Sequence, residues 1–236
     1  MTADDRGARR SYRSTVREGR ARHTRWRILE AAQEAFVARG YAGTTVRAIA
    51  SAAGVSVATV ELLFGTKAAV LKAAIDVAIA GDDEPVPVLD RSWAEVARRA
   101  PAAEEFLGVV VGVLAPAQAR SAGLVLAALE ASATDPDLAV LSDQLIGQRE
   151  TTAGWIVDTL ATKAPLRPEL SRQQAVETVW LLMDPAVFVR LTRQRQWGLE
   201  RYQAWIARSV GNLLLPDATY PSSHPTRART TTKETT

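Results

Sequence analysis

Cysteine is absent from the 236-residue sequence, and histidine occurs only twice. Without cysteine the chain forms no disulfide and no thiolate metal site, which favours a reducing cytoplasm. The two histidines, His23 and His224, stand before the first predicted helix and in a predicted disordered tail. The folded core therefore offers neither a Ser-His-Asp triad nor a histidine metal site. Glycine-rich phosphate-binding motifs are also missing, so we expect no enzyme, no cofactor and no metal.

Long apolar runs and strand signals are scarce as well. The longest apolar candidate, Phe106–Ala115, stops at Pro116 and is shorter than a membrane-spanning helix. The first ten residues have no apolar segment after their charges and do not resemble a secretory signal. No alternating β-branched run bounded by turns occurs. We therefore expect an all-α, cytoplasmic protein without a membrane partner.

Charge is unevenly distributed along the chain. Residues 1–75 contain 13 Lys and Arg against 6 Asp and Glu, a net charge of +7, whereas residues 76–236 have a net charge of −4. This asymmetry indicates that the first third meets a polyanion such as nucleic acid. The alternative interpretation of the charge alone is a solubilising basic tail.

Helical periodicity begins near Thr24, after a basic segment of residues 1–22 that we expect to be disordered. Ile28, Leu29, Ala32 and Phe36 form one apolar stripe of a helix that ends at Gly40. Thr44, Ser56 and Thr66 then each precede an apolar-periodic run, as helix caps do.

Two short helices joined by a tight turn at Gly54 predict a helix-turn-helix motif over residues 44–67, whose second helix enters the major groove. The exposed start of that helix must be small or polar to approach base edges. Ser56, Val57, Ala58 and Thr59 stand there, and Val57 or Ala58 is suited to pack on a thymine methyl group.

Residues 82–91 contain two prolines and an acidic run, and we interpret them as the connection to a second domain. We expect their acidic side chains to be solvated rather than to bind metal. Helical patterning continues over residues 92–215, with further caps at Ser92, Ser171 and Asp184 and an opening Asp135-Pro136. Residues 216–236 are rich in threonine and proline and are expected to be disordered.

Residues 24–81 resemble the DNA-binding domain of the TetR (tetracycline repressor) family of bacterial regulators. The residues that carry the resemblance are Ile28, Leu29, Ala31, Ala32, Phe36, Arg39-Gly40-Tyr41, Thr44-Thr45-Val46, Ile49-Ala50, Ala53-Gly54-Val55-Ser56, Thr59-Val60, Phe64 and Thr66-Lys67. Near the C-terminus, Gln196-Trp197-Gly198, Glu200, Tyr202 and Trp205 resemble the dimerisation end of such regulators. The resemblance implies a DNA-binding domain over residues 23–81 and a ligand-binding and dimerisation domain over residues 82–215.

The resemblance also implies roles for single residues. Thr45 would bind a DNA phosphate at a helix N-terminus, Arg47 would contact a base or phosphate, and Lys67 would bind another phosphate. Thr59 would contact the groove, and the basic arm would follow the DNA backbone or enter a minor groove. The complete set of candidate DNA contacts is Thr44, Thr45, Arg47, Ser56, Val57, Ala58, Thr59 and Lys67.

Glu61 departs from the family pattern, which often has a tyrosine at this position that contacts phosphate. A carboxylate repels phosphate, so this contact is not expected here. Glu61 is suited to accept a hydrogen bond from a cytosine amino group or to pair with Arg47 or an arm arginine. The interpretation we favour is that Glu61 faces solvent.

These observations predict a cytoplasmic, nucleoid-associated transcriptional regulator, with repression favoured by the resemblance. A two-fold dimer would bind a pseudo-palindromic operator and pair through its last two helical segments, residues 171–193 and 199–215. A largely apolar small-molecule effector would bind among residues 93–180, where Trp93, Phe106, Trp155 and Trp180 are candidate pocket walls. For each of these four rings, however, packing in the core is the interpretation that we favour. The rival interpretation is a nonspecific architectural DNA-binding protein.

Overall fold

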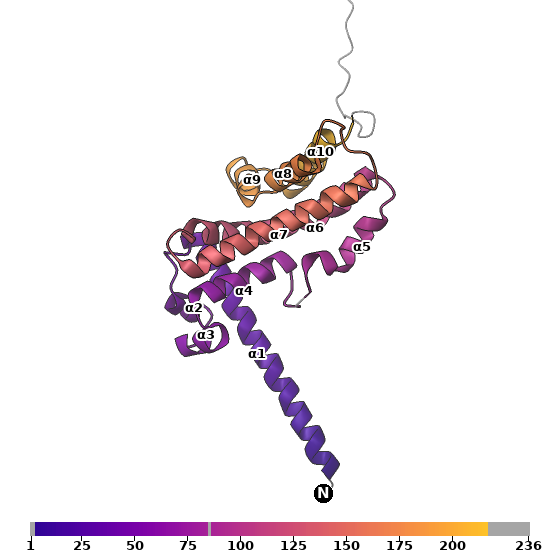
Figure 1. The fold of residues 1–236 in the computed structure, drawn as a ribbon. Coiled ribbons are helices and arrows are strands. Elements are labelled where there is room, and N and C mark those ends of the chain that lie inside the picture. Colours follow the sequence, from indigo (N-terminus) through magenta and orange to yellow (C-terminus); the bar gives the residue numbers. More distant parts are fainter. Residues whose placement is uncertain (1–2, 85, 217–236) are drawn as a thin grey trace, which may run out of the picture.

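The computed structural model describes residues 3–84 and 86–216, with side chains from residue 19 onward, and its elements are all helices (Figure 1). The expected all-α fold is confirmed for this part of the chain. The helices of the first third are α1 (Ala3–Arg39), α2 (Val46–Ala52), α3 (Val57–Phe64) and α4 (Lys67–Ala80). After a short 3-10 turn (Val88–Asp90) come α5 (Ser92–Arg99), α6 (Ala103–Ala131), α7 (Pro136–Ala161), α8 (Arg172–Leu182), α9 (Pro185–Val189), a π turn (Arg190–Gln194) and α10 (Leu199–Leu214).

Side-chain caps begin several of these helices where the sequence predicts them, but the predicted cap at Ser92 is wrong, because Ser92 is the first residue of α5 and makes no capping hydrogen bond. The hydroxyls of Ser56, Thr66 and Ser171 each accept a hydrogen bond from a backbone N–H in the first turn of α3, α4 and α8. Asp184 caps α9 in the same way. The expected cap of α2 is wrong by one residue, because Thr45, not Thr44, accepts from the backbone N–H of Ala48.

Helix α1 begins at Ala3, well before Thr24, so residues 3–22 continue the helix where the sequence predicts disorder. No proline interrupts residues 3–39 and most of them are good helix formers. The ordered, apolar end of α1 therefore serves as a nucleus onto which further turns are added at little cost. The side chains of residues 1–18, including five arginines of the proposed arm, and the predicted tail from residue 217 onward lie outside the described residues.

Helix α6 continues through Pro116, where the apolar run Phe106–Ala115 stops. A proline inside a helix costs ~3 kcal/mol. Large apolar side chains are buried on both sides of it, including Phe106 and Leu107 before it and Leu124 after it, and each contributes about 1.5–3 kcal/mol. The resulting 29-residue helix is long and apolar enough to cross a membrane, but half of its most apolar stretch is buried inside the protein, as in a central core helix.

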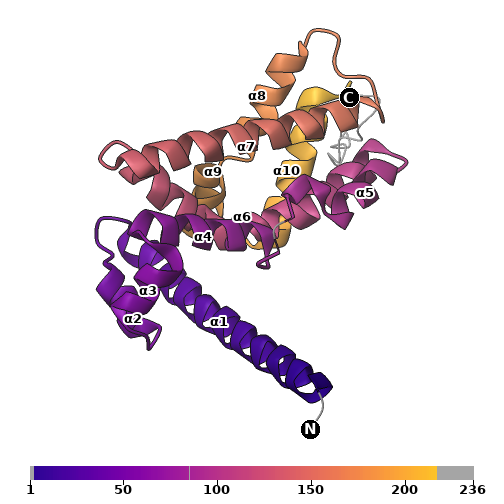
Figure 2. The same ribbon diagram turned by 60° about the horizontal axis from the view of Figure 1, so that its bottom comes forward.

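Two apolar cores share helices α6 and α7. One core is formed by α1, α2, α3 and α4 together with the end of α6 and the start of α7. The other is formed by α5, the first half of α6, the end of α7 and helices α8, α9 and α10. Helix α4 lies between the α2–α3 pair and the long α6–α7 pair, and α8–α10 lie on the opposite side of α6 and α7 (Figures 1 and 2). The two cores are therefore joined by continuous helices.

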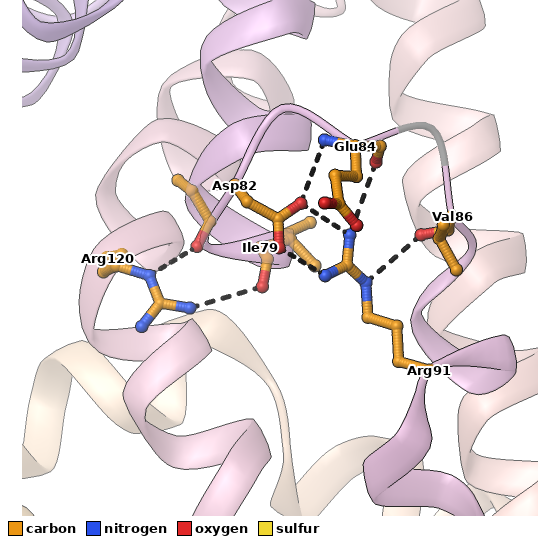
Figure 3. A network of polar contacts seen from close by, with 7 residues as sticks. Ile79, Asp82, Glu84, Val86, Arg91 and Arg120 are labelled. Carbon is orange, nitrogen blue, oxygen red and sulfur yellow. Dashed lines mark hydrogen bonds and ion pairs between the residues drawn. The ribbon is translucent and has the colours of Figure 1, made fainter.

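The link between α4 and α5 is held by two arginines (Figure 3). Arg120 on α6 donates to the carbonyls of Ala78 (2.9 Å) and Ile79 (3.4 Å) at the end of α4. Arg91 donates to both carboxylate oxygens of Asp82, at 2.6 and 2.9 Å. This pair, above all its hydrogen bonds, lowers the pKa of Asp82 to about 2. The acidic linker is therefore folded back on itself through Asp82 rather than fully solvated.

Candidate nucleic-acid interface

The turn between α2 and α3 has the geometry of a helix-turn-helix. The chain bends by 109° between the two helices, within the range typical of that motif. Gly54 has φ +63°, a backbone conformation that glycine adopts without steric cost. The turn is closed by the backbone N–H of Val55, which donates to the carbonyl of Ala50 at 2.9 Å. The sequence-predicted motif is therefore present at the predicted residue.

Arg27 on α1 holds this turn in place. Its guanidinium donates to the carbonyl of Ala53 through a short hydrogen bond and lies 3.4 Å from the carbonyl of Gly54. Both carbonyls belong to the turn, so α1 fixes the direction in which α3 leaves it. Sequence reasoning missed this role, because the contact joins residues 26 positions apart.

Helix α3 presents a mixed outer face. Ser56, Ala58, Glu61 and Leu62 are exposed, whereas Val60 is buried. The hydroxyls of Ser56 and Thr59 lie 2.8 Å apart and share a hydrogen bond. Small and polar groups therefore occupy the start of the helix, as a DNA-recognition helix requires.

Val57 does not belong to that outer face. It is half-buried and packs on the first core beside Leu63 and Phe64. The predicted contact between Val57 and a thymine methyl group is therefore not supported by its position. Leu62, which the sequence analysis did not select, is the apolar residue that α3 exposes. Its position two residues from the buried Val60, about 200° around the helix, is the signal that identifies it.

Thr44 and Thr45 have different roles. Thr44 is fully buried, and its hydroxyl lies 3.0 Å from the carbonyl of Ala35 and 2.8 Å from that of Gly40. The hydroxyl faces the protein, so we withdraw Thr44 as a candidate DNA contact. Thr45 is exposed at the N-terminus of α2, and its hydroxyl proton remains available to a phosphate oxygen while its oxygen caps the helix.

Lys67 is tied to the α1–α2 turn. Its ammonium donates to the carbonyls of Tyr41 (2.9 Å) and Thr44 (3.1 Å) and lies 3.8 Å from the centre of the Tyr41 ring. Burial lowers its pKa. Two of its three N–H groups are thus used inside the protein, and one remains for the predicted phosphate contact.

Tyr41 connects this site to the rest of the molecule. Its hydroxyl donates to Oδ2 of Asp135 at 2.8 Å. The other oxygen of Asp135 caps α7 by accepting from the backbone N–H of Asp137 at 3.0 Å. One carboxylate therefore joins the α1–α2 turn to the start of α7.

Exposed cationic side chains lie on the two helices that precede α3. Arg47 on α2 and Arg20 and Arg22 on α1 are exposed, and Arg25 lies over the Phe64 ring. Among the described side chains Glu61 forms no ion pair and is exposed, as in our favoured interpretation. Helices α1 and α2 therefore carry exposed cations, whereas α3 itself carries one exposed carboxylate.

The four candidate pocket residues separate into two groups. The rings of Trp93 and Phe106 lie 5.4 and 5.8 Å from that of Trp155, so these three form one cluster. Trp180 lies apart, under the guanidinium of Arg149. Arg149 is also 2.8 Å from the carboxylate of Asp184.

Residues 28–74, from the buried end of α1 into α4, match the family model described as bacterial regulatory proteins, tetR family. The chain therefore carries the DNA-binding domain of the TetR family of regulators. It is accordingly a DNA-binding transcriptional regulator and not an enzyme. No curated protein matches the chain at a significant level.

Solved structures share the TetR fold with this chain at low sequence identity. The transcriptional regulator FadR from Bacillus subtilis, in complex with stearoyl-CoA, is 18% identical with a TM-score of 0.62, covering 80% of this chain and 98% of its own. A regulator from Saccharomonospora viridis in complex with choline is 18% identical with a TM-score of 0.61, covering 82% and 98%. A TetR-family regulator from Mesorhizobium loti is 16% identical with a TM-score of 0.61, covering 82% and 96%.

Proposed function

We propose that this TetR-family regulator is a cytoplasmic homodimer that represses transcription from a pseudo-palindromic operator and is released by a largely apolar small molecule. The observation that carries the proposal is the 109° helix pair, which exposes the small and polar start of α3 beside Arg47. Residues 23–81 form the DNA-binding domain, and residues 82–215 bind the effector and dimerise. The candidate DNA contacts are Thr45, Arg47, Ser56, Ala58, Thr59 and Lys67.

Helices α8 and α10 are the proposed dimer interface. They run antiparallel, because the segment before α8 returns to the end of α10, where the backbone N–H of Arg167 donates to the carbonyl of Leu214. Leu181 on α8 and Leu213 on α10 are 60% and 50% exposed. Two such helices from each subunit form a four-helix bundle that covers both leucines. A two-fold dimer then presents its α3 helices about 34–36 Å apart, one turn of DNA.

The Trp93–Trp155–Phe106 cluster is the proposed effector contact. Its rings are apolar, and the indole Nε1 of Trp93 is buried without a hydrogen-bond partner. An apolar effector with one acceptor group would satisfy this donor. Two structures of the same fold hold small ligands, stearoyl-CoA in one and choline in the other, which supports a ligand-responsive second domain.

Helix α4 is the proposed transmitter between effector and DNA. Lys67 ties its first turn to the α1–α2 turn, and Arg120 ties its last turn to α6. An effector that moves α6 therefore displaces α4 and changes the spacing of the two α3 helices. A coupling free energy of ~1–3 kcal/mol suffices for regulation.

The test begins with selection of operator sequences from random DNA, followed by measurement of affinity against salt concentration. About eight phosphate contacts per dimer give a log–log slope near −7. Arg47→Ala should reduce that slope by about 2 per dimer. Arg47 is a cleaner probe than Lys67, whose removal also breaks two internal hydrogen bonds.

Arg99→Ala is the matched control, because Arg99 is an exposed arginine on α5. It should leave the slope unchanged. A wild-type slope near zero, or equal affinity for selected and random DNA, would contradict the proposed function. Equal affinity would favour the architectural alternative.

A further inference from the structure

Leu62 is the most exposed large apolar residue among the described side chains. It is 86% exposed, whereas the next most exposed such residues, Val140 and Leu181, are each 60% exposed. Leu62 lies near the end of α3, one turn after the exposed Ala58. A leucine held in water in this way gives up the stabilisation that its burial would supply.

The fold does not explain this exposure. The other apolar residues in the second half of α3 face inward, with Val60 buried and Leu63 and Phe64 packed on the first core. Leu62 points away from all three, so it contributes nothing to that core. Many polar residues have comparable helix propensity, so a helical position alone does not call for leucine.

We propose that Leu62 determines operator specificity by packing on the methyl group of a thymine in the major groove. The inference rests on the proposed function and deepens it, because it names the base that this surface reads. The 5-methyl group of thymine is the apolar feature that a major groove displays, and aliphatic side chains contact it. Burying Leu62 against that methyl group removes from water the apolar surface that the isolated protein exposes.

The neighbours of Leu62 support a position over base edges rather than over the DNA backbone. Ala58 lies one turn earlier, about 40° around the helix from Leu62, and its small side chain lets the helix approach the groove closely. Glu61 is exposed beside Leu62 and forms no ion pair among the described side chains. Phosphates repel a carboxylate, so this edge of α3 avoids them and faces the bases.

The test replaces single thymines of the selected operator by uracil, which removes only the methyl group. For the wild-type protein we expect one thymine in each half-site at which uracil lowers affinity about fourfold, the factor that corresponds to ~0.8 kcal/mol for one buried methyl group. Replacement in both half-sites should lower affinity about 15-fold. For Leu62→Ala we expect the uracil and thymine operators to bind equally at that position.

Val96→Ala is the matched control, because Val96 is an exposed apolar residue on α5 with 57% exposure. It should retain the full uracil penalty. Leu62→Ala is expected to fold normally, since Leu62 is exposed and alanine has the higher helix propensity.

The outcomes separate this inference from the function on which it rests. Selective operator binding with uracil penalties that Leu62→Ala leaves unchanged would overturn the role of Leu62 and retain the regulator. The same result is expected if Leu62 instead binds a protein partner. Absence of any selective DNA binding would overturn both.

Discussion

Removal of the Tyr41 hydroxyl should weaken the attachment of the DNA-binding domain to α7. Tyr41→Phe keeps the ring, which stacks on Phe36 with centroids 6.0 Å apart and lies under the Lys67 ammonium. It removes only the 2.8 Å hydrogen bond to Asp135. A hydrogen bond to a charged group contributes about 1.5–3 kcal/mol. Because Asp135 is partly exposed and water replaces the lost donor in part, we expect the lower limit, ~1.5 kcal/mol.

The expected loss corresponds to a fall in Tm of about 3–6 °C, since ~1 kcal/mol shifts Tm by about 2–4 °C in a domain of this size. Asp135 has a second role as the cap of α7, so a single substitution there does not isolate the bond. Asp135→Asn retains capping ability. An asparagine at this position can still bond to the Tyr41 hydroxyl, so the double-mutant cycle of Tyr41→Phe and Asp135→Asn measures what the carboxylate charge adds to the bond.

We expect a coupling free energy of about 1 kcal/mol in this cycle, measured by urea unfolding of all four proteins at neutral pH. Tyr202→Phe is a matched control, because it removes a hydroxyl that bonds to Gln118 in the second core instead. Its effect should add to that of Asp135→Asn within about 0.5 kcal/mol. Strict additivity of Tyr41→Phe and Asp135→Asn would refute the charge-assisted bond between Tyr41 and Asp135, and an unchanged stability of Tyr41→Phe would refute the bond as a tie between the two parts of the molecule.

Two further predictions concern buried hydroxyl groups. Thr44→Val should destabilise the protein by about 1–3 kcal/mol, because it removes the hydroxyl proton shared by the carbonyls of Ala35 and Gly40, and Thr44→Ser should restore most of that loss. Operator affinity of the folded Thr44→Val protein should stay unchanged, and a loss of affinity at full stability would return Thr44 to the DNA surface. Burial raises the pKa of Tyr202 and of Tyr41 above the ordinary value of 10, so both stay protonated in the folded protein when the unfolded chain has lost those protons. Their stabilising contribution is complete below pH 10 and is lost as pH rises above it. Above pH 10 the free energy of unfolding of the wild-type protein should fall with pH, and Tyr202→Phe should make that slope shallower by ~1.4 kcal/mol per pH unit. The slope is measured by urea unfolding at a series of alkaline pH values, and an unchanged slope would contradict the burial of the Tyr202 hydroxyl.

Local signals in the sequence were sufficient for the helix-turn-helix. Gly54 identified the turn, and the Ser56 and Thr66 caps gave the starts of α3 and α4, because capping and positive φ depend on neighbouring residues alone. The same signals failed at Thr44, where two adjacent threonines both fit a cap. Only the packing of α1 against the turn decides that Thr44 is buried and that Thr45 caps α2.

Interruptions of the apolar helical periodicity were less informative than the periodicity itself. The apolar run before Pro116 stops at that proline, and the absence of apolar periodicity predicted disorder before Thr24, yet α6 and α1 continue through both positions. A local free-energy penalty of a few kcal/mol ends a helix only when no long-range packing compensates for it. In α6, burial of apolar side chains along the whole helix compensates for the penalty of Pro116.

The sequence by itself determined the helical class, the position of the DNA-reading helix and the excess of positive charge in the first third of the chain. All three depend on periodicity, short-range caps and composition. The tertiary structure alone decided which faces of those helices are available: it buried Thr44, turned Val57 inward, left Leu62 in water and joined Tyr41 to Asp135. These outcomes depend on contacts between residues up to 94 positions apart, and such contacts are set by the packing of α1, α6 and α7 rather than by any local pattern.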